Sequence, residues 1–404
     1  MALPPIVALE IGTSKVIALV GEMREDSYIM ITGVGECASR GVRKGEVTDV
    51  EAVTACVRTA MEGAEESGNV AIREVLLAIS GAHVLSACNR GSVPVMNREG
   101  VIGADDVEQV RDVARAINLP GDREIIHSLS QHYTIDDQDR VVRPDGMMGA
   151  RLTHEMLIVH VLRSRMETAV RIVQGLPMEV GDVVFGGLCS ALAVMTPEQR
   201  KSGCVVIDMG AGTTDYMAYT GGVPAAAGVI GVGGDHITND IAMAFNISSA
   251  QAERLKRESA SALTGGVGRA QRVSLPPEVG FTSRSVPMGA LNTVVHARVE
   301  ETLSIVRGRL DRDGVLGHVG AVVMTGGGAR LRGLCELAEQ ILGKPCDVGR
   351  PRGVTGAAAV TDGPEYATCS GLVQYGFKEH SERRHEPLLG RLIKGLGLGS
   401  RLKG

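Results

Sequence analysis

Two short polar turns in this chain combine a carboxylate, glycine and hydroxyl residues in nearly the same order. The first reads Glu10-Ile11-Gly12-Thr13-Ser14-Lys15 and the second Asp208-Met209-Gly210-Ala211-Gly212-Thr213-Thr214-Asp215. Glycine lets backbone N–H groups approach a phosphate closely, hydroxyls add donors, and a carboxylate positions Mg²⁺, usually through water. Each turn therefore has the composition of a phosphate loop, and Lys15 adds a cation that can reach a β-phosphate.

A third glycine-rich turn, Gly326-Gly327-Gly328, follows the apolar run 322–325 and precedes a helical pattern over 331–342. At a strand-to-helix turn, such residues let the backbone pass close to a nucleoside. A single turn of this kind is commonly just a hairpin. Three in this order, the first two about 200 residues apart, predict a nucleotide site between two lobes. We expect Glu10 and Asp208 to position Mg²⁺ there, mostly through water.

Apolar runs on both sides of the two carboxylate turns predict the strands that position them. Ile6–Leu9 and Val16–Val20 flank the first turn, and residues 204–207 and 216–219 flank the second. This repeat, half a chain apart, indicates two related α/β halves. Further expected elements are a helix over 50–66, strands over 75–80 and 157–162, and a helix over 165–173.

The composition fits a protein of two or three domains with a substantial core. The chain has 404 residues, 44% of them hydrophobic, and a net charge of −5 from 42 basic and 47 acidic side chains. This balance excludes a nucleic-acid binder driven by basic charge, so no nucleic acid partner is expected. Glycine is abundant, with 53 residues, whereas aromatic residues make up 2%. Six of these glycines form part of the three turns, where they indicate phosphate loops rather than low complexity, and most of the others have no assigned role.

Cysteine and histidine spacings argue against a disulfide framework or a metal cage. The eight cysteines form no C-x-x-C pair and the histidines no H-E-x-x-H motif, so we expect free thiols in a reducing compartment. The first residues lack a basic segment, and no run of 18 apolar residues exists. Neither a signal peptide nor a membrane span is therefore expected.

The three turns resemble those of the actin, Hsp70 and sugar-kinase ATPase superfamily. Residues 10–15 and 208–215 resemble its two phosphate loops, and residues 325–328 resemble its adenosine loop. The resemblance implies ATP and Mg²⁺ as ligands, and a two-lobed α/β actin-like fold with ribonuclease H-like halves. It also extends to a Gly-Gly-Asp segment and to a Glu and a Lys that flank adenine and ribose in bacterial actins: Gly233, Gly234, Asp235, Glu253 and Lys256.

Within the superfamily, three features resemble the FtsA family. The first turn, Leu9-Glu10-Ile11-Gly12-Thr13, has Glu where actins and chaperones have Asp. The stretch 85–161, with Gln131-His132-Tyr133 and Gly149-Ala150-Arg151-Leu152, resembles the subdomain inserted in FtsA. The tail 388–404 resembles the FtsA membrane-targeting helix. The alternatives are a pilus-assembly-type actin-like protein and a small-molecule kinase or phosphatase of the same superfamily.

The resemblance also implies a division of the chain into lobes and subdomains. The parts are a first nucleotide-binding lobe (1–84 and 162–200), the inserted subdomain (85–161), a second lobe (201–236 and 301–377), a small subdomain of that lobe (237–300), a linker (378–387) and the tail (388–404). The small subdomain would contact adenine and carry a partner site.

Rapid hydrolysis is not expected. Hydrolysing relatives orient the attacking water with a Glu or Gln in a strand–helix connection. The corresponding stretch, 183–191, has glycines at this place, which leaves Glu10, Asp208 or Asp215 to orient a water. We therefore predict at most a slow ATPase, in which ATP acts as a conformational and assembly ligand.

The tail has the pattern of a basic amphipathic helix. At 100° per residue, its apolar side chains fall within an arc of about 140°, opposite the two cations. The apolar residues are Leu388, Leu389, Leu392, Ile393 and Leu396, and the cations are Arg391 and Lys394. Such a helix suits an anionic membrane surface, although a helix packed on its own domain would show the same pattern. Because one short helix binds weakly, a filament that presents many tails would bind far better.

The family resemblance further implies partners and a location. In FtsA, the small subdomain binds the C-terminal peptide of FtsZ, and Arg298 resembles a basic position of that site. A solvated helix charge is the plainer explanation of this residue. The implied partners are FtsZ, other copies of the chain in an actin-like filament, other divisome proteins and the membrane. The implied location is the cytoplasmic face of the inner membrane at the division site.

Overall fold

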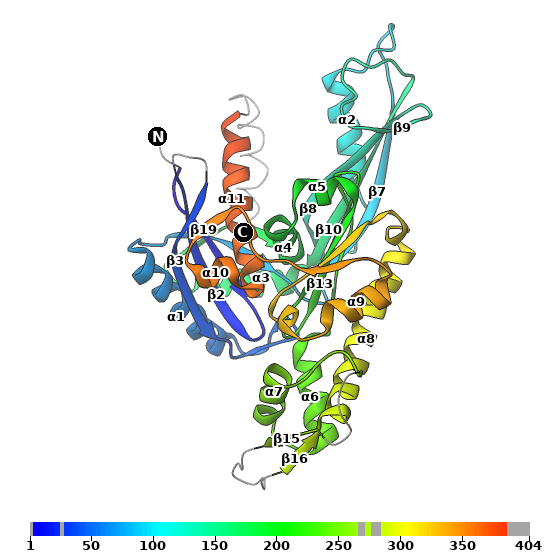
Figure 1. The fold of residues 1–404 in the computed structure, drawn as a ribbon. Coiled ribbons are helices and arrows are strands. Elements are labelled where there is room, and N and C mark those ends of the chain that lie inside the picture. Colours follow the sequence, from blue (N-terminus) through cyan, green and yellow to red (C-terminus); the bar gives the residue numbers. More distant parts are fainter. Residues whose placement is uncertain (1–2, 25–27, 266–270, 276–283, 386–404) are drawn as a thin grey trace.

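The computed structural model describes residues 3–24, 28–265, 271–275 and 284–385 (Figure 1). Its first half is built on a six-stranded sheet in the order β11-β6-β1-β2-β3-β19. The strands are β1 (Ile6–Ile11), β2 (Lys15–Met23), β3 (Ile29–Ala38), β6 (Glu74–Ile79), β11 (Glu179–Phe185) and β19 (Val354–Gly356). β1 pairs antiparallel with β2 and parallel with β6, so the first carboxylate turn lies between two central strands.

The second half repeats this plan in the five-stranded sheet β14-β13-β12-β17-β18. Its strands are β12 (Cys204–Met209), β13 (Thr214–Thr220), β14 (Val223–Ile230), β17 (Ala321–Thr325) and β18 (Cys346–Val348). In both halves, three antiparallel strands are continued by two parallel strands in the same spatial order. The two related α/β halves predicted from the repeated turn are thus confirmed.

Successive side chains along the central strands pack into different hydrophobic cores. Ala8 of β1 and Val206 of β12 belong to one core shared by the two sheets, while their neighbours Leu9 and Ile207 face outward into separate cores. This alternation is the period of a strand buried on both faces. Helices α4 (Gly186–Val194) and α11 (Ala367–His385) lie in the shared core. Helices α1 (Val50–Gly68) and α3 (Arg163–Gln174) cover the outer face of the first sheet.

The insertion is a four-stranded antiparallel sheet, β7-β10-β8-β9, that rises from the first half beside the second (Figure 1). It contains β7 (Leu85–Pro94), α2 (Ala104–Arg115), β8 (Arg123–Ile135), β9 (Gln138–Val141) and β10 (Arg151–Leu162). Ser86 Oγ donates to the Ala227 carbonyl at 2.6 Å, and Gln131 Nε2 donates to the Pro224 carbonyl at 2.8 Å. The inserted sheet therefore rests on strand β14 of the second half.

The small subdomain extends from the second sheet at the bottom of Figure 1. It comprises α6 (Gly234–Phe245), α7 (Ser249–Glu258), β15 (Arg272–Leu275), β16 (Arg284–Pro287) and the first part of α8 (Met288–Arg312). Helix α8 passes position 300, so the expected subdomain boundary falls inside a helix. The buried residues of α8 belong to the same hydrophobic core as those of α9 (Leu334–Leu342). The small subdomain and the second lobe therefore share one core.

Residues 378–385, most of the stretch expected to be a linker (378–387), continue helix α11; these eight residues contain neither glycine nor proline. One sequence expectation needs correction. The helix expected from Leu331 begins at Leu334, since Gly333 before it has a φ of +74° and residues 327–330 form a 3₁₀ turn. The predicted tail, 388–404, lies outside the described residues.

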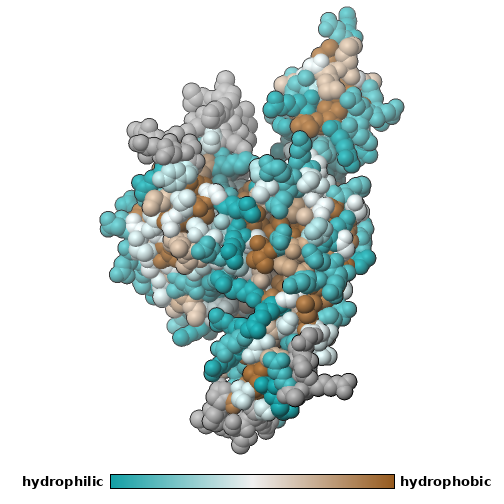
Figure 2. Space-filling model, in the orientation of Figure 1, coloured by the Kyte–Doolittle hydropathy of each residue, from teal (hydrophilic) through white to brown (hydrophobic). Residues whose placement is uncertain are grey.

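The remaining elements are short: β4 (Val42–Arg43), β5 (Glu46–Val47), α5 (Pro197–Ser202), α10 (Ala358–Asp362) and the 3₁₀ turns Leu316–His318, Gly327–Arg330 and Pro364–Tyr366. The face in Figure 2 is largely hydrophilic, with hydrophobic residues gathered near the middle of the molecule and on the insertion. All eight cysteines are free thiols, as expected. Within the described ranges, no helix has both the length and the apolar character that crossing a membrane requires.

Candidate functional site

The two carboxylate turns face one another across a cavity of about 900 Å³ between the halves. Each turn is closed by the same backbone bond: the Gly12 N–H donates to the Lys15 carbonyl at 3.0 Å, and the Gly210 N–H to the Thr213 carbonyl at 2.9 Å. A Cβ at Gly12 would lie 2.7 Å from the Lys15 carbonyl oxygen, so this tight turn requires glycine. The cavity has the size of a site for a large organic ligand.

Most of the residues predicted to bind nucleotide line this one cavity. They are Glu10, Gly12, Thr13, Ser14, Lys15, Asp208, Gly210, Gly212, Thr213, Gly234, Asp235, Glu253, Lys256, Gly326, Gly327 and Gly328. Thr214 and Gly233 lie outside the lining. Thr214 is fully buried and donates to the Val232 carbonyl, and a Cβ at Gly233 would lie 2.6 Å from the Ala211 carbonyl oxygen. These two residues shape the backbone of the site instead of facing the cavity.

The third glycine turn packs directly against the Asp208 carboxylate at the edge of the cavity. Gly326 has a φ of +79°, and a Cβ there would lie 2.1 Å from Asp208 Oδ1. No side chain larger than hydrogen fits between this turn and the second carboxylate turn. The neighbouring loop is thus the structural reason for glycine at 326, and the approach of residues 326–328 to a nucleoside stays a prediction.

Three carboxylic acids meet at the floor of the cavity. Burial, followed by the charge of Asp208, raises the pKa of Glu10 to about 8. Burial, together with the charge of Asp208, raises the pKa of Asp215 well above its ordinary value. Burial also raises the pKa of Asp208, although hydrogen bonds to its carboxylate oppose the shift. Without a cation, this cluster favours protonated acids over three neighbouring charges.

The donor set fits Mg²⁺ held through water. Within the ranges the structure describes, no group of three or more His, Cys, Asp or Glu side chains has the geometry of a direct metal cage. Mg²⁺ keeps several of its waters and needs only one or two carboxylates nearby, which Glu10 and Asp208 provide. Lys15 neutralises the cluster only in part: its charge opposes the rise of the Glu10 pKa, but its Nζ also lies 3.2 Å from Glu36 Oε2. When the acids ionise, this single lysine does not balance their charge.

Three hydroxyl residues that the sequence did not single out hold these acids in place. Ser190 Oγ and Thr368 Oγ1 both donate to Asp208 Oδ2, the latter at 3.1 Å, and Ser80 Oγ donates to Asp215 Oδ1 at 2.6 Å. They come from α4, α11 and the end of β6. The one signal available in the sequence was a lone hydroxyl within an otherwise apolar segment, as at Ser190.

The strand–helix connection between β11 and α4 brings glycine beside the acids. Gly186 lines the cavity, and a Cβ there would lie 3.2 Å from Asp215 Oδ2. The place where hydrolysing relatives are expected to present Glu or Gln thus has no side chain. That Glu10, Asp208 or Asp215 orients any water stays a prediction, and Glu36, Asp235 and Glu365 line the same cavity.

Two ion pairs border the cavity, one between residues of α7 and one beside the third glycine turn. Lys256 Nζ lies 2.6 Å from Glu253 Oε2 and donates to the Gly234 carbonyl at 3.0 Å, which fixes both predicted residues against the start of α6. Arg330 donates two hydrogen bonds of 2.9 Å to Glu365, and both residues line the cavity. The sequence did not predict either residue at this site. Arg330 lies two residues after the third glycine turn.

Arg298, the predicted partner-binding residue, lies on α8 away from the cavity lining. Its guanidinium makes a two-pronged pair with Asp240, at 2.5 and 3.1 Å, and also contacts Glu301. These bonds raise its pKa further above the ordinary value. An acidic peptide that binds here must therefore compete with two carboxylates of the chain itself.

Comparison with known proteins agrees with this architecture. A family described as cell division protein FtsA matches residues 205–371, and one described as the SHS2 domain inserted in FtsA matches residues 81–160. The cell division protein FtsA of Pseudomonas aeruginosa is 35% identical over 93% of this chain and 90% of its own length. That of Escherichia coli is 34% identical over 93% and 91%, and that of Borreliella burgdorferi 30% over 99% and 97%.

Solved structures show the fold. A chain of the PilM-PilN type IV pilus biogenesis complex has a TM-score of 0.66 at 18% identity, covering 92% of this chain and 98% of that one. The ethanolamine utilization protein EutJ from Carboxydothermus hydrogenoformans has a TM-score of 0.52 at 15% identity, covering 92% and 90%. The predicted α/β actin-like fold with an inserted subdomain is thereby confirmed.

Proposed function

The chain belongs to the family of the cell division protein FtsA, and from this premise we propose that it is an ATP-dependent membrane anchor for FtsZ filaments. A role in cell division follows from the family itself. The proposal adds that the chain binds ATP with Mg²⁺ in the large cavity, polymerises, and holds FtsZ at the inner face of the cytoplasmic membrane.

One observation carries the nucleotide part of the proposal. The two carboxylate turns come from equivalent hairpins of the two halves and line one cavity together with the third glycine turn. In that cavity, the backbone of the turns and the hydroxyls of Thr13 and Thr213 would hold phosphates. Lys15 would supply a cation after leaving Glu36, and residues 326–328 would border the nucleoside.

The chain supplies binding and orientation rather than a strong hydrolytic group. When bound, Mg²⁺ neutralises negative charge on the phosphates and on the carboxylates that face it. Glu10 and Asp208 would hold its waters. Because Gly186 adds no side chain beside Asp215, any attacking water lacks the Glu or Gln of hydrolysing relatives. We propose at most slow turnover, with ATP stabilising the closed arrangement of the lobes.

The membrane part rests on the sequence of the tail and on where the fold delivers it. Helix α11 packs in the core shared by both sheets and ends at His385, directly before residues 388–404. A tail attached to this helix is connected to both lobes through one element. Because a single short amphipathic helix binds weakly, assembly into filaments would supply the avidity for stable anchoring.

The decisive experiment is electron microscopy of the full chain with ATP and Mg²⁺ on a monolayer that contains anionic lipid. We expect filaments on the lipid, and we expect deletion of residues 388–404 to abolish liposome co-sedimentation while leaving nucleotide binding intact. Substitution of Asp208 by Asn should reduce nucleotide binding and filaments without changing the tail. If the truncated chain co-sediments as well as the full chain, the tail is not the anchor.

A further inference from the structure

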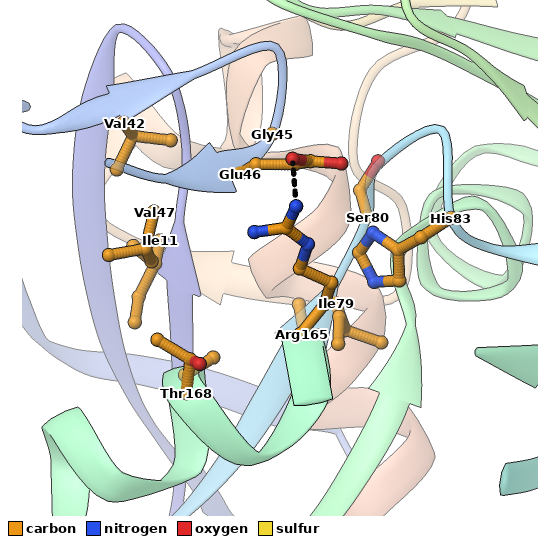
Figure 3. Close-up of a pocket in the computed structure, with 12 residues that line it drawn as sticks. Ile11, Val42, Gly45, Glu46, Val47, Ile79, Ser80, His83, Arg165 and Thr168 are labelled. Atoms are coloured by element: carbon orange, nitrogen blue, oxygen red, sulfur yellow. Dashed lines mark ion pairs between the residues drawn. The ribbon is translucent and has the colours of Figure 1, made fainter. Parts of the chain in front are cut away.

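A second, smaller cavity lies behind the first carboxylate turn and has a volume of about 70 Å³. Figure 3 shows its walls, which come from the β4–β5 hairpin, the end of β6 and helix α3. Five of its lining residues also border the large cavity, but Glu46, His83, Arg165 and Thr168 belong to the small cavity alone. It is thus a separate compartment that shares a wall with the nucleotide site.

His83 is an unpartnered buried group in this small cavity. Its side chain is 7% exposed, and neither ring nitrogen has a hydrogen-bond partner within the structure described. Burial lowers the pKa of its imidazole to about 4, so the ring is neutral and offers one donor and one acceptor. Buried polar groups are nearly always hydrogen-bonded, so a ring with both nitrogens free indicates a missing partner.

Arg165 is a second source of free donors at the same cavity. One of its terminal nitrogens lies 3.3 Å from Glu46 Oε2, as the dashed line in Figure 3 marks. The side chain is 48% exposed, so solvent reaches its other N–H groups, and none of them donates to a residue that the structure describes. An arginine fork can present two parallel donors to an oxyanion while it keeps an acid on its remaining edge. Apart from the hydroxyls of Ser80 and Thr168, the other walls are apolar, with Val42, Val47 and Ile79 among them.

We propose that the small cavity is a binding site for a small oxyanion, with the Arg165 guanidinium as its anchor and the His83 ring N–H as a second donor. A volume of 70 Å³ holds a few waters or one small ion. The apolar walls favour a short-chain carboxylate over inorganic phosphate, since its hydrocarbon end would replace water there. Glu46 competes for Arg165, so its charge limits the affinity of the site.

The β4–β5 hairpin connects this site to the first carboxylate turn. Glu46 follows Gly45 in the β4–β5 hairpin, and the Gly45 N–H donates to Thr13 Oγ1 at 3.0 Å. A ligand that draws on Arg165 therefore acts on the hairpin that supports Thr13. Binding of the oxyanion can be measured without nucleotide, so the proposal stands whether or not the large cavity binds ATP.

The test uses the nucleotide-free full chain with histidine labelled at ring carbon ε1, titrated with acetate, butyrate and inorganic phosphate at constant ionic strength. Proton–carbon spectra follow the His83 signal, assigned by its loss in the H83Q variant. We expect saturable shifts at millimolar concentrations. R165Q should weaken binding at least tenfold and R165K less so, because lysine keeps the charge but loses the fork. E46Q should tighten binding several-fold.

The variants separate an anion site from a structural ion pair. R165Q and E46Q break the same pair, so a purely structural effect would move the affinity in the same direction in both. The control is R163Q: Arg163 lies on the same helix, outside the cavity, and pairs with Glu124 at 3.1 Å. Butyrate tighter than phosphate identifies a carboxylate, and the reverse order identifies phosphate. The absence of a saturable His83 shift with all three anions, or parallel effects of R165Q and E46Q, would overturn the proposal.

Discussion

Glu10 provides the sharpest test of the proposed magnesium–nucleotide site, because its protonation must change when the cation binds. In the ion-free chain, its pKa is raised to about 8, chiefly by burial and then by the charge of Asp208. At pH 7 an acid with this pKa is roughly nine-tenths protonated, whereas a carboxylate that faces Mg²⁺ must be ionised. Binding of the magnesium–nucleotide complex should therefore release about 0.9 proton from Glu10 at pH 7.

The same raised pKa of Glu10 sets the size and sign of the pH dependence of magnesium–nucleotide affinity. Ionising Glu10 at pH 7 costs about 1.4 kcal/mol, a factor of roughly ten in affinity. Below pH 8 the affinity should rise up to tenfold per pH unit through this residue, and above pH 8 the contribution should level off. The folding stability of the ion-free chain has the opposite pH dependence: it falls as pH rises. A raised carboxyl pKa stabilises the folded state at low pH, and this stability is lost as pH rises from 4.5 through about 8.

Calorimetric titration in two buffers of different ionisation enthalpy measures the protons released. The E10Q variant cannot release this proton, so subtracting its value removes protons that come from the ligand itself. We expect a difference of about 0.9 proton at pH 7 that falls toward zero at pH 9. E365Q is the control, because Glu365 lines the same cavity but pairs with Arg330. Equal proton release by the wild-type chain and E10Q would refute the reasoning.

Two further predictions concern the helices. A Cβ at Gly371 of α11 would lie 1.8 Å from the Cys189 carbonyl oxygen of α4, so G371A should destabilise the chain by about 2 kcal/mol or more. G308A on α8, where nothing lies within 4 Å, should stabilise it by about 0.5–1 kcal/mol, and urea unfolding measures both. If the chain binds the FtsZ C-terminal peptide at Arg298, as proposed, D240N should tighten that binding several-fold by weakening the competing pair. Fluorescence anisotropy measures the affinity, and an unchanged value would argue against Arg298 as a peptide contact.

The sequence predicted best what is decided locally. A turn such as 10–15 is closed by a bond between its own residues, so its glycines and hydroxyls already define it. The hydroxyls that hold the acids were missed because they reach the site through tertiary packing: Thr368 meets Asp208 from 160 residues away. Thr214 was assigned to the cavity by its place in the motif, but strand alternation turns its side chain inward, where it bonds Val232.

The acid cluster also explains why a ligand in this cavity would control the arrangement of the lobes. Glu10 belongs to the first sheet, whereas Asp208 and Asp215 belong to the second. When these acids are ionised without a cation, their repulsion acts across the boundary between the halves, and a bound cation reverses it.

Ser80 of the first half donates to Asp215 of the second, so the floor of the cavity is already bridged by a hydrogen bond. Helices α4 and α11, which supply the hydroxyls on Asp208, pack in the core that both sheets share. The Asp208 carboxylate at the cavity floor is therefore hydrogen-bonded directly to α11, the helix that precedes the tail in the sequence.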